Sequence, residues 1–176
     1  VDFWSLKGSA GRVVPVLCDY RDPSSIAQAV AGCSAVVNTI GILFEKRRGQ
    51  RFHSVHSVLP GTIAKACQNA GVKAFVHISA LGADTGHSLY AKSKLEGEKA
   101  VMSGFKGATI LRPSIVFGAE DNFFNMFAGM AKFLPFLPLI GGGKTRFQPV
   151  YVGDVADAVI TALHQSEAKG VIYELG

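Results

Sequence analysis

Tyr90 and Lys94, four residues apart, are the side chains of this sequence best suited to do chemistry. In a helix this spacing places both on one face, one turn apart. An ammonium held near a phenol favours the phenolate, so the pair predicts a lowered tyrosine pKa and the proton transfer of carbonyl reduction. A chance Tyr-x-x-x-Lys is common in a basic chain, and the interpretation therefore depends on the elements around it.

The elements that must position this pair alternate between strand and helix. Short apolar runs predict strands at residues 13–18, 35–40, 74–79, 108–111, 147–152 and 171–175. Helices are predicted from Asp22-Pro23 to near Gly32, over residues 58–70, around Tyr90 and Lys94, and over residues 155–164 with Asp154 as the cap. This alternation predicts an α/β fold with a parallel, doubly wound sheet.

Size and composition set limits on the class of protein. A chain of 176 residues with 48% hydrophobic residues is one domain with a proper core, not a disordered segment. The only dense basic cluster, residues 46–51, lacks interleaved aromatics and predicts a solvated loop, so no nucleic acid is expected. The three cysteines are predicted to be buried free thiols, and no histidine spacing predicts a metal site.

The ends of the chain and its aromatic segment bear on location and partners. The sequence starts at Val1 without a charged leader, which predicts a fragment with no targeting segment. Residues 122–140 are rich in Phe and predict a helix that ends before Pro135. This segment is too polar and too broken by proline for a membrane span. It is expected to pack in a subdomain, with a substrate lid, a partner surface or a peripheral membrane contact as alternatives.

Polar and small residues follow the predicted strands, and ligands of such sheets bind beyond the strands' carboxyl ends. Asp19 could accept a hydrogen bond from an adenine amino group, or hold a turn. Residues 38–41 end the second strand, where Gly41 permits close approach of a nucleotide or forms a tight turn. Ser79, which precedes Tyr90 by eleven positions, could polarise a carbonyl or be an ordinary strand-end serine.

The fourth strand ends at Arg112-Pro113. Because proline lacks an N–H donor, Pro113 indicates a backbone that turns there past a bound cofactor. Arg112 is expected instead to be a structural partner of a carboxylate or of carbonyl groups.

Taken in order, these motifs resemble the extended short-chain dehydrogenase/reductases, which are similar to NAD-dependent epimerases and dehydratases. The resemblance is carried by Asp19, Asn38-Thr39-Ile40-Gly41, Ser79, Tyr90, Lys94, and residues 112–118 and 149–155. Residues 77–83, 90–98, 117–123 and 148–152 resemble an atypical branch, which contains the NADPH-binding accessory subunit of respiratory complex I and its bacterial relatives.

The resemblance implies a single Rossmann-type NAD(P)-binding domain over residues 1–176, truncated at both ends. Its first strand and glycine-rich turn would precede Val1, and residues 119–146 would belong to a small subdomain facing substrate or partner. Catalytic roles are implied for Tyr90, Lys94 and Ser79. The implied cofactor-binding residues are Asp19, Asn38, Thr39, Ile40, Gly41, Ser79, Tyr90, Lys94 and Pro113. NADP(H) is favoured and NAD(H) is the alternative, because the residues that choose between them would precede Val1.

Two departures from the family pattern affect the expected function. Ala80 stands where many extended reductases carry a second hydroxyl, and His56 stands at a helix position that often holds asparagine. We therefore expect an accessory-subunit-like protein that uses bound NADP(H) structurally. The alternative is an active NAD(P)-dependent oxidoreductase or nucleotide-sugar epimerase/dehydratase with Tyr90 as acid/base. The expected partners are a dinucleotide and respiratory complex I subunits, in the bacterial cytoplasm at the inner face of the membrane or in the mitochondrial matrix.

Overall fold

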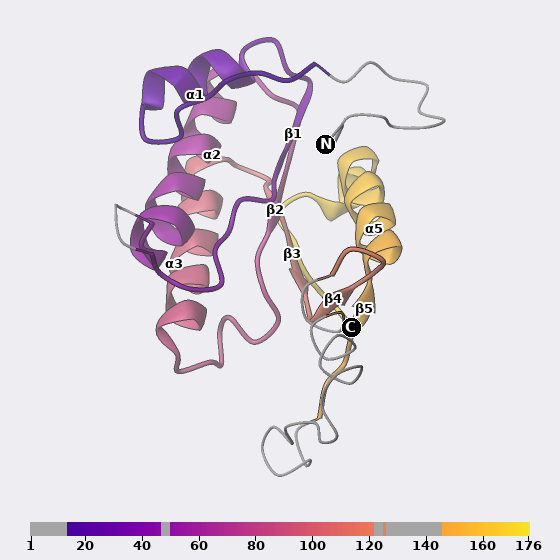
Figure 1. The fold of residues 1–176 in the computed structure, drawn as a ribbon. Coiled ribbons are helices and arrows are strands. Elements are labelled where there is room, and N and C mark those ends of the chain that lie inside the picture. Colours follow the sequence, from indigo (N-terminus) through magenta and orange to yellow (C-terminus); the bar gives the residue numbers. More distant parts are fainter. Residues whose placement is uncertain (1–13, 47–49, 122–124, 126–145) are drawn as a thin grey trace.

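A computed structural model describes residues 14–46, 50–121, 125 and 146–176 of the chain (Figure 1). Its centre is a parallel sheet with the strand order β1-β2-β3-β6. The strands are β1 (Ala35–Asn38), β2 (Ala74–Ile78), β3 (Thr109–Pro113) and β6 (Ile172–Leu175). In the register of the sheet Asn38 lies opposite His77, and His77 lies opposite Ile110. The predicted parallel α/β fold is thereby confirmed.

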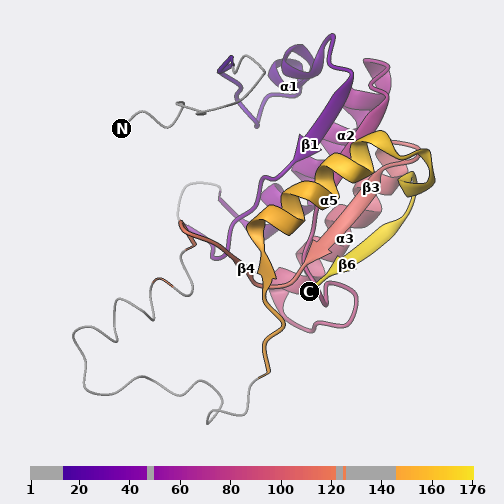
Figure 2. The same cartoon turned by 90° about the vertical axis from the view of Figure 1, so that its right-hand side faces the viewer.

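Helices cover both faces of this sheet (Figures 1 and 2). One layer holds α1 (Pro23–Val30), α2 (Leu59–Asn69) and α3 (Leu89–Gly104), and the other holds α5 (Val152–His164). Successive residues of a strand point to opposite faces, so Phe75 packs against Val101 and Phe105 while Val76 packs against Ala162. The two resulting cores make the sheet doubly wound.

Short elements complete the described part of the chain. A π-helix, η1 (His53–Val58), leads directly into α2, and a 3-10 helix, η3 (Ser166–Ala168), follows α5. A separate pair of parallel strands joins β4 (Val116–Phe117) to β5 (Val150–Tyr151). None of the helices among the described residues is long and apolar enough to cross a membrane.

Hydroxyl and carboxylate caps fix where two of the helices begin. The Asp22 carboxylate accepts a hydrogen bond from the Ser24 N–H at 2.9 Å, directly before Pro23, as the sequence predicts for α1. The Ser88 hydroxyl accepts the Ala91 N–H at 3.1 Å at the start of α3. This cap places Tyr90 in the first turn of α3, with Lys94 one turn further on the same face.

Three local predictions are wrong. The three free cysteines are not all buried: Cys67 is buried, Cys33 is partly buried and Cys18 is exposed. The described part of the predicted first strand, residues 14–18, forms no strand and is exposed, because no described strand lies beside it to share a hydrogen-bond ladder. Asp154 is not the cap of α5: the helix begins at Val152 after Tyr151, so Asp154 lies within its first turn. The predicted helix after residue 121 falls, apart from residue 125, outside the described residues, and so does most of the predicted subdomain 119–146.

Candidate active site

Three groups converge at the carboxyl end of β2. Lys94 is 5% exposed and its Nζ donates a hydrogen bond to the Ile78 carbonyl at 3.0 Å. A methyl group placed on Gly41 would lie 3.8 Å from the Lys94 Nζ and 3.6 Å from the His56 Nε2. The structure therefore brings predicted Lys94 and Gly41 together, and it adds His56, which the sequence marks only as a departure from the family pattern.

Tyr90 is half-buried in a cluster of three aromatic rings. Its ring meets the His56 ring edge-on at a centroid separation of 5.3 Å and the Phe52 ring at 5.8 Å. Phe52 and His56 are themselves stacked at 5.4 Å. The phenol of Tyr90 is thus held by apolar and aromatic surfaces contributed by η1 and the residue before it.

The predicted lowering of the tyrosine pKa is wrong. Burial raises the pKa of Tyr90, because the phenolate is poorly solvated in its aromatic surroundings. Burial also lowers the pKa of Lys94 to about 8, an effect that the nearby Glu98 carboxylate partly offsets. Burial is the cause of the Tyr90 shift, and the Lys94 ammonium donates its hydrogen bond to the Ile78 carbonyl.

A pair of buried side chains holds the end of β1. The Asn38 Oδ1 accepts the Ile40 N–H at 3.1 Å, which directs the Asn38 amide N–H toward the His77 Nδ1 at 3.0 Å. Both side chains are almost fully buried, and the His77 Nε2 has no hydrogen-bond partner among the described residues. The sequence gives no sign of this pairing, because 39 positions separate the two residues. No group of three His, Cys, Asp or Glu within the described ranges could hold a metal ion.

We expect the free energy of unfolding of the full-length protein to fall as the pH drops from about 6.5 to about 4. Burial, together with the charge of Lys94, lowers the pKa of His56 to about 4 and that of His77 to about 3. In this range the unfolded chain binds protons that the folded chain rejects, so each histidine removes up to about 1.4 kcal/mol per pH unit.

Denaturant unfolding at a series of pH values measures this dependence. His77→Gln should reduce the slope of the free energy of unfolding against pH. A free energy of unfolding that stays constant from pH 6.5 to 4 would contradict the prediction.

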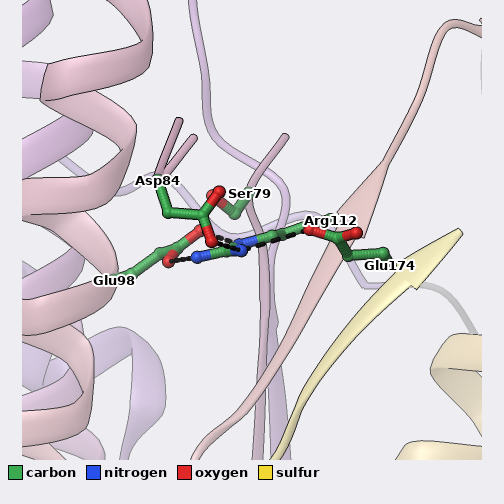
Figure 3. A network of polar contacts seen from close by, with 5 residues as sticks. All are labelled: Ser79, Asp84, Glu98, Arg112 and Glu174. Carbon is green, nitrogen blue, oxygen red and sulfur yellow. Dashed lines mark hydrogen bonds and ion pairs between the residues drawn. The ribbon is translucent and has the colours of Figure 1, made fainter. Parts of the chain in front are cut away.

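Ser79 belongs to a partly buried ionic network at the carboxyl ends of the strands (Figure 3). Its hydroxyl donates a hydrogen bond to the Glu98 Oε1. The Arg112 guanidinium donates hydrogen bonds to both carboxylate oxygens of Glu98, at 2.9 and 2.8 Å. The Arg112 Nη1 also contacts Asp84 at 2.7 Å and Glu174 at 3.2 Å. The prediction that Arg112 is a structural partner of carboxylates is confirmed. The catalytic role of Ser79 stays a prediction, and its only hydroxyl proton is directed at Glu98.

Asp19 and Pro113 both take part in hydrogen bonds with other residues of the chain. The Asp19 carboxylate is paired with the Arg21 guanidinium at 3.1 Å and accepts the Arg21 N–H at 3.0 Å, which lowers the pKa of Asp19 and matches its predicted turn role. Pro113 is the last residue of β3, and its buried carbonyl accepts the Leu81 N–H at 2.9 Å. Binding of a dinucleotide by either residue stays a prediction.

A pocket of about 200 Å³ opens beside the end of β1. It joins the residues flanking Asp19 to three of the predicted cofactor-binding residues. The lining residues are Cys18, Tyr20, Ile26, Ala29, Val30, Val36, Val37, Asn38, Thr39, Ile40, Leu59 and Ile63. Pockets for whole ligands usually measure about 300–1,000 Å³, so this mostly apolar pocket suits one part of a dinucleotide, such as a base.

A doubly wound parallel sheet, with a helix-borne Tyr and Lys beside its strand ends, defines a Rossmann-like nucleotide-binding domain. Residues 6–176 match the NAD dependent epimerase/dehydratase family, and the chain belongs to that family.

Similar proteins indicate the branch of the family to which this chain is related. The chain is 38% identical over 173 residues to NADH dehydrogenase [ubiquinone] 1 alpha subcomplex subunit 9, mitochondrial, of Arabidopsis thaliana, covering 97% of this chain and 43% of that protein. It is 41% identical over 170 residues to the protein of the same name from Mus musculus, covering 96% and 45%. The chain spans less than half the length of these relatives. They confirm the predicted resemblance to the branch of the complex I accessory subunit.

Solved structures confirm the fold. A dTDP-4-dehydrorhamnose reductase from Clostridium acetobutylicum superposes with a TM-score of 0.73 at 18% identity, over 96% of this chain and 66% of that one. A UDP-glucuronic acid 4-epimerase from Bacillus cereus, solved with UDP-glucuronic acid and NAD, superposes with the same TM-score of 0.73 at 18% identity, over 90% and 58%. At these identities the likeness establishes the architecture alone.

Proposed function

We propose that this chain forms the dinucleotide-binding part of a mitochondrial complex I accessory subunit, in which bound NADP(H) serves to stabilise the fold. The observation that carries this proposal is the state of the two groups at the site. The Tyr90 phenol is held in its protonated form by burial, and the Lys94 ammonium is turned toward the Ile78 carbonyl. Such a site is better suited to holding hydroxyl groups than to moving a proton.

The residues present fit a nicotinamide dinucleotide. An ammonium has three N–H donors, and the described residues engage one of those of Lys94, which leaves two for ribose hydroxyls. Residues 39–41 are exposed, and a methyl group on Gly41 would lie 3.8 Å from the Lys94 Nζ. The neighbouring pocket would take the adenine, and Asp19, whose chain neighbours Cys18 and Tyr20 line that pocket, would accept a hydrogen bond from the adenine amino group. Ligand binding to the folded state alone would stabilise the protein by mass action.

The names of the relatives support the partner and the location that we propose. Proteins 38–41% identical to this chain are named as mitochondrial subunits of NADH dehydrogenase. These names favour the mitochondrion over the bacterial cytoplasm as the location. They also favour respiratory complex I subunits as the partners. For the cofactor we keep NADP(H) as the proposal and NAD(H) as the alternative, since the described residues fit the parts that both dinucleotides share.

The second candidate function is that of an active oxidoreductase or nucleotide-sugar epimerase/dehydratase. The observation that favours this function is that Tyr90 and Lys94 lie on one face of α3. In such an enzyme the nicotinamide would supply or accept a hydride. Tyr90 would give or take the proton at the substrate oxygen, and Lys94 would hold the ribose. Two observations disfavour this function. Burial raises the pKa of Tyr90, and the Ser79 hydroxyl already donates its hydrogen bond to Glu98.

We expect the full-length protein to bind NADPH saturably, and Lys94→Met to weaken this binding at least about tenfold through the lost charge-assisted hydrogen bonds. Tyr90→Phe should keep binding within a few-fold. Lys92→Met is the matched control, because Lys92 is an exposed lysine of the same helix. Titration of NADPH and NADH, followed by the fluorescence of the nicotinamide, measures all four proteins.

Absence of saturable binding to the wild type would overturn the proposed function. Turnover of carbonyl compounds or nucleotide sugars that is lost in Tyr90→Phe would establish the enzyme instead. Co-purification of NADH dehydrogenase subunits with the wild-type protein tests the proposed partner separately.

A further inference from the structure

We propose that His56 is a positioning residue for dinucleotide binding: its buried imidazole fixes residues 39–42, here called the β1 loop, against the start of α3. The inference rests on the proposed function, in which this loop lies against the cofactor. It assigns to the His56 side chain a role that its place in the sequence does not predict.

The β1 loop has little support of its own. It belongs to no helix or strand, and residues 39–41 are exposed. Two of its N–H groups are held by buried side chains from outside the loop. The Ile40 N–H is bound by Asn38 at 3.1 Å, and the Ile42 N–H is bound by the His56 Nε2 at 2.9 Å. Gly41 lies between these two anchors, where its Cα faces His56 and Lys94.

The protons along this chain of contacts have one consistent arrangement. A backbone N–H only donates, so the His56 Nε2 must accept from Ile42 and the ring proton must sit on Nδ1. The Nδ1–H then donates to the Ser93 hydroxyl at 3.0 Å, and that hydroxyl donates to the Tyr90 carbonyl at 2.7 Å. Hydrogen bonds therefore run without a break from the turn of α3 that carries Tyr90 to the β1 loop.

The environment of His56 keeps this arrangement in place. The residue is 1% exposed, and its ring packs against the rings of Phe52 and Tyr90. Burial and the positive charge of Lys94 lower the pKa of His56 to about 4, so the ring is neutral and its Nε2 lone pair stays available near neutral pH. An imidazole is the side chain that can accept at one end, donate at the other and pack against neighbouring aromatic rings.

Two substitutions separate the hydrogen bond from the packing. His56→Phe keeps an aromatic ring against Phe52 and Tyr90 but cannot accept the Ile42 N–H. His56→Gln loses the ring but carries an amide oxygen that can accept it. A positioning role predicts that Phe weakens NADPH binding by the full-length protein about tenfold and that Gln recovers most of this loss. A packing role alone predicts the reverse order.

The matched controls are His53→Phe and His53→Gln, at an exposed position of the same π-helix. Both should leave NADPH binding unchanged. Hydrogen exchange without ligand gives a second readout: in His56→Phe the Ile42 amide should exchange faster, while the amides of β2 keep their protection. Equal or tighter binding in the Phe variant than in the Gln variant, or unchanged exchange at Ile42, would overturn the inference.

The two proposals fail in different ways. If the wild-type protein binds no dinucleotide, the proposed function fails, and the exchange of Ile42 still decides whether His56 holds the β1 loop. If the wild type binds NADPH and both His56 variants bind it equally well, the proposed function stands and the positioning role of His56 is excluded.

Discussion

Replacing Gly97 by alanine is expected to destabilise the protein by about 3 kcal/mol or more, although alanine is normally the better residue in a helix. Gly97 lies in the middle of α3, where that helix crosses η1. A methyl group at Gly97 would lie 1.9 Å from the His56 carbonyl oxygen and 3.1 Å from its carbon. Both atoms are backbone, so no side-chain rotation can relieve the clash, and the two helices would have to move apart.

Denaturant unfolding of Gly97→Ala beside the wild type measures this cost. Gly41→Ala is the matched control, because its methyl group would meet only ordinary contacts of 3.6 and 3.8 Å. We expect the control to change the free energy of unfolding by less than about 1 kcal/mol. Since Gly→Ala within a helix usually stabilises by about 0.5–1 kcal/mol, a stabilised Gly97→Ala protein would show that α3 and η1 do not meet as described.

Replacing Arg112 by methionine should cost about 3–5 kcal/mol, the usual effect of breaking a buried ion pair from one side. The Glu98 carboxylate, 2% exposed, would lose both of its guanidinium hydrogen bonds and, among the described residues, keep only the one from the Ser79 hydroxyl. Arg112 also joins Asp84, which precedes α3, to Glu174 on β6. The substitution therefore removes the cross-link between the ends of β2, β3 and β6 and the helix that carries Tyr90 (Figure 3).

Two further variants test the reason given for the Arg112 prediction. The double substitution Arg112→Met with Glu98→Leu removes both charges and should recover part of the loss, because no buried carboxylate remains unpaired. Arg21→Met is the control: Arg21 and Asp19 form an ion pair whose side chains are 73% and 51% exposed, and such solvent-screened pairs contribute little to stability. If Arg112→Met costs no more than Arg21→Met in denaturant unfolding, the network does not stabilise the fold.

Local signals in the sequence were sufficient for the elements that carry the site. The Asp22-Pro23 start of α1 and the strands near residues 35–40 and 74–79 rest on caps and apolar runs that act within a few residues. The placing of Tyr90 and Lys94 on one face of α3 follows from helical spacing alone. Such features are predictable because the interactions that create them join neighbours in the chain.

Strand pairing is a different case, as residues 14–18 demonstrate. Their apolar, β-branched composition predicts a strand, yet the described structure leaves them outside the sheet. A strand is completed by hydrogen bonds to a neighbour that lies far away in the sequence. Composition indicates that a segment can be a strand, and only the arrangement of the other strands decides whether it becomes one.

The sequence by itself therefore determined the class of fold, the family and the placing of Tyr90 and Lys94 on one face of a helix. The tertiary structure alone decided what those groups can do. It turned Lys94 to the Ile78 carbonyl, buried the Tyr90 phenol against aromatic rings, and directed the Ser79 hydroxyl to Glu98. It also brought His56 to the β1 loop. The physical reason is that pKa values and hydrogen-bond partners depend on burial and on groups from distant elements, which spacing along the chain does not specify.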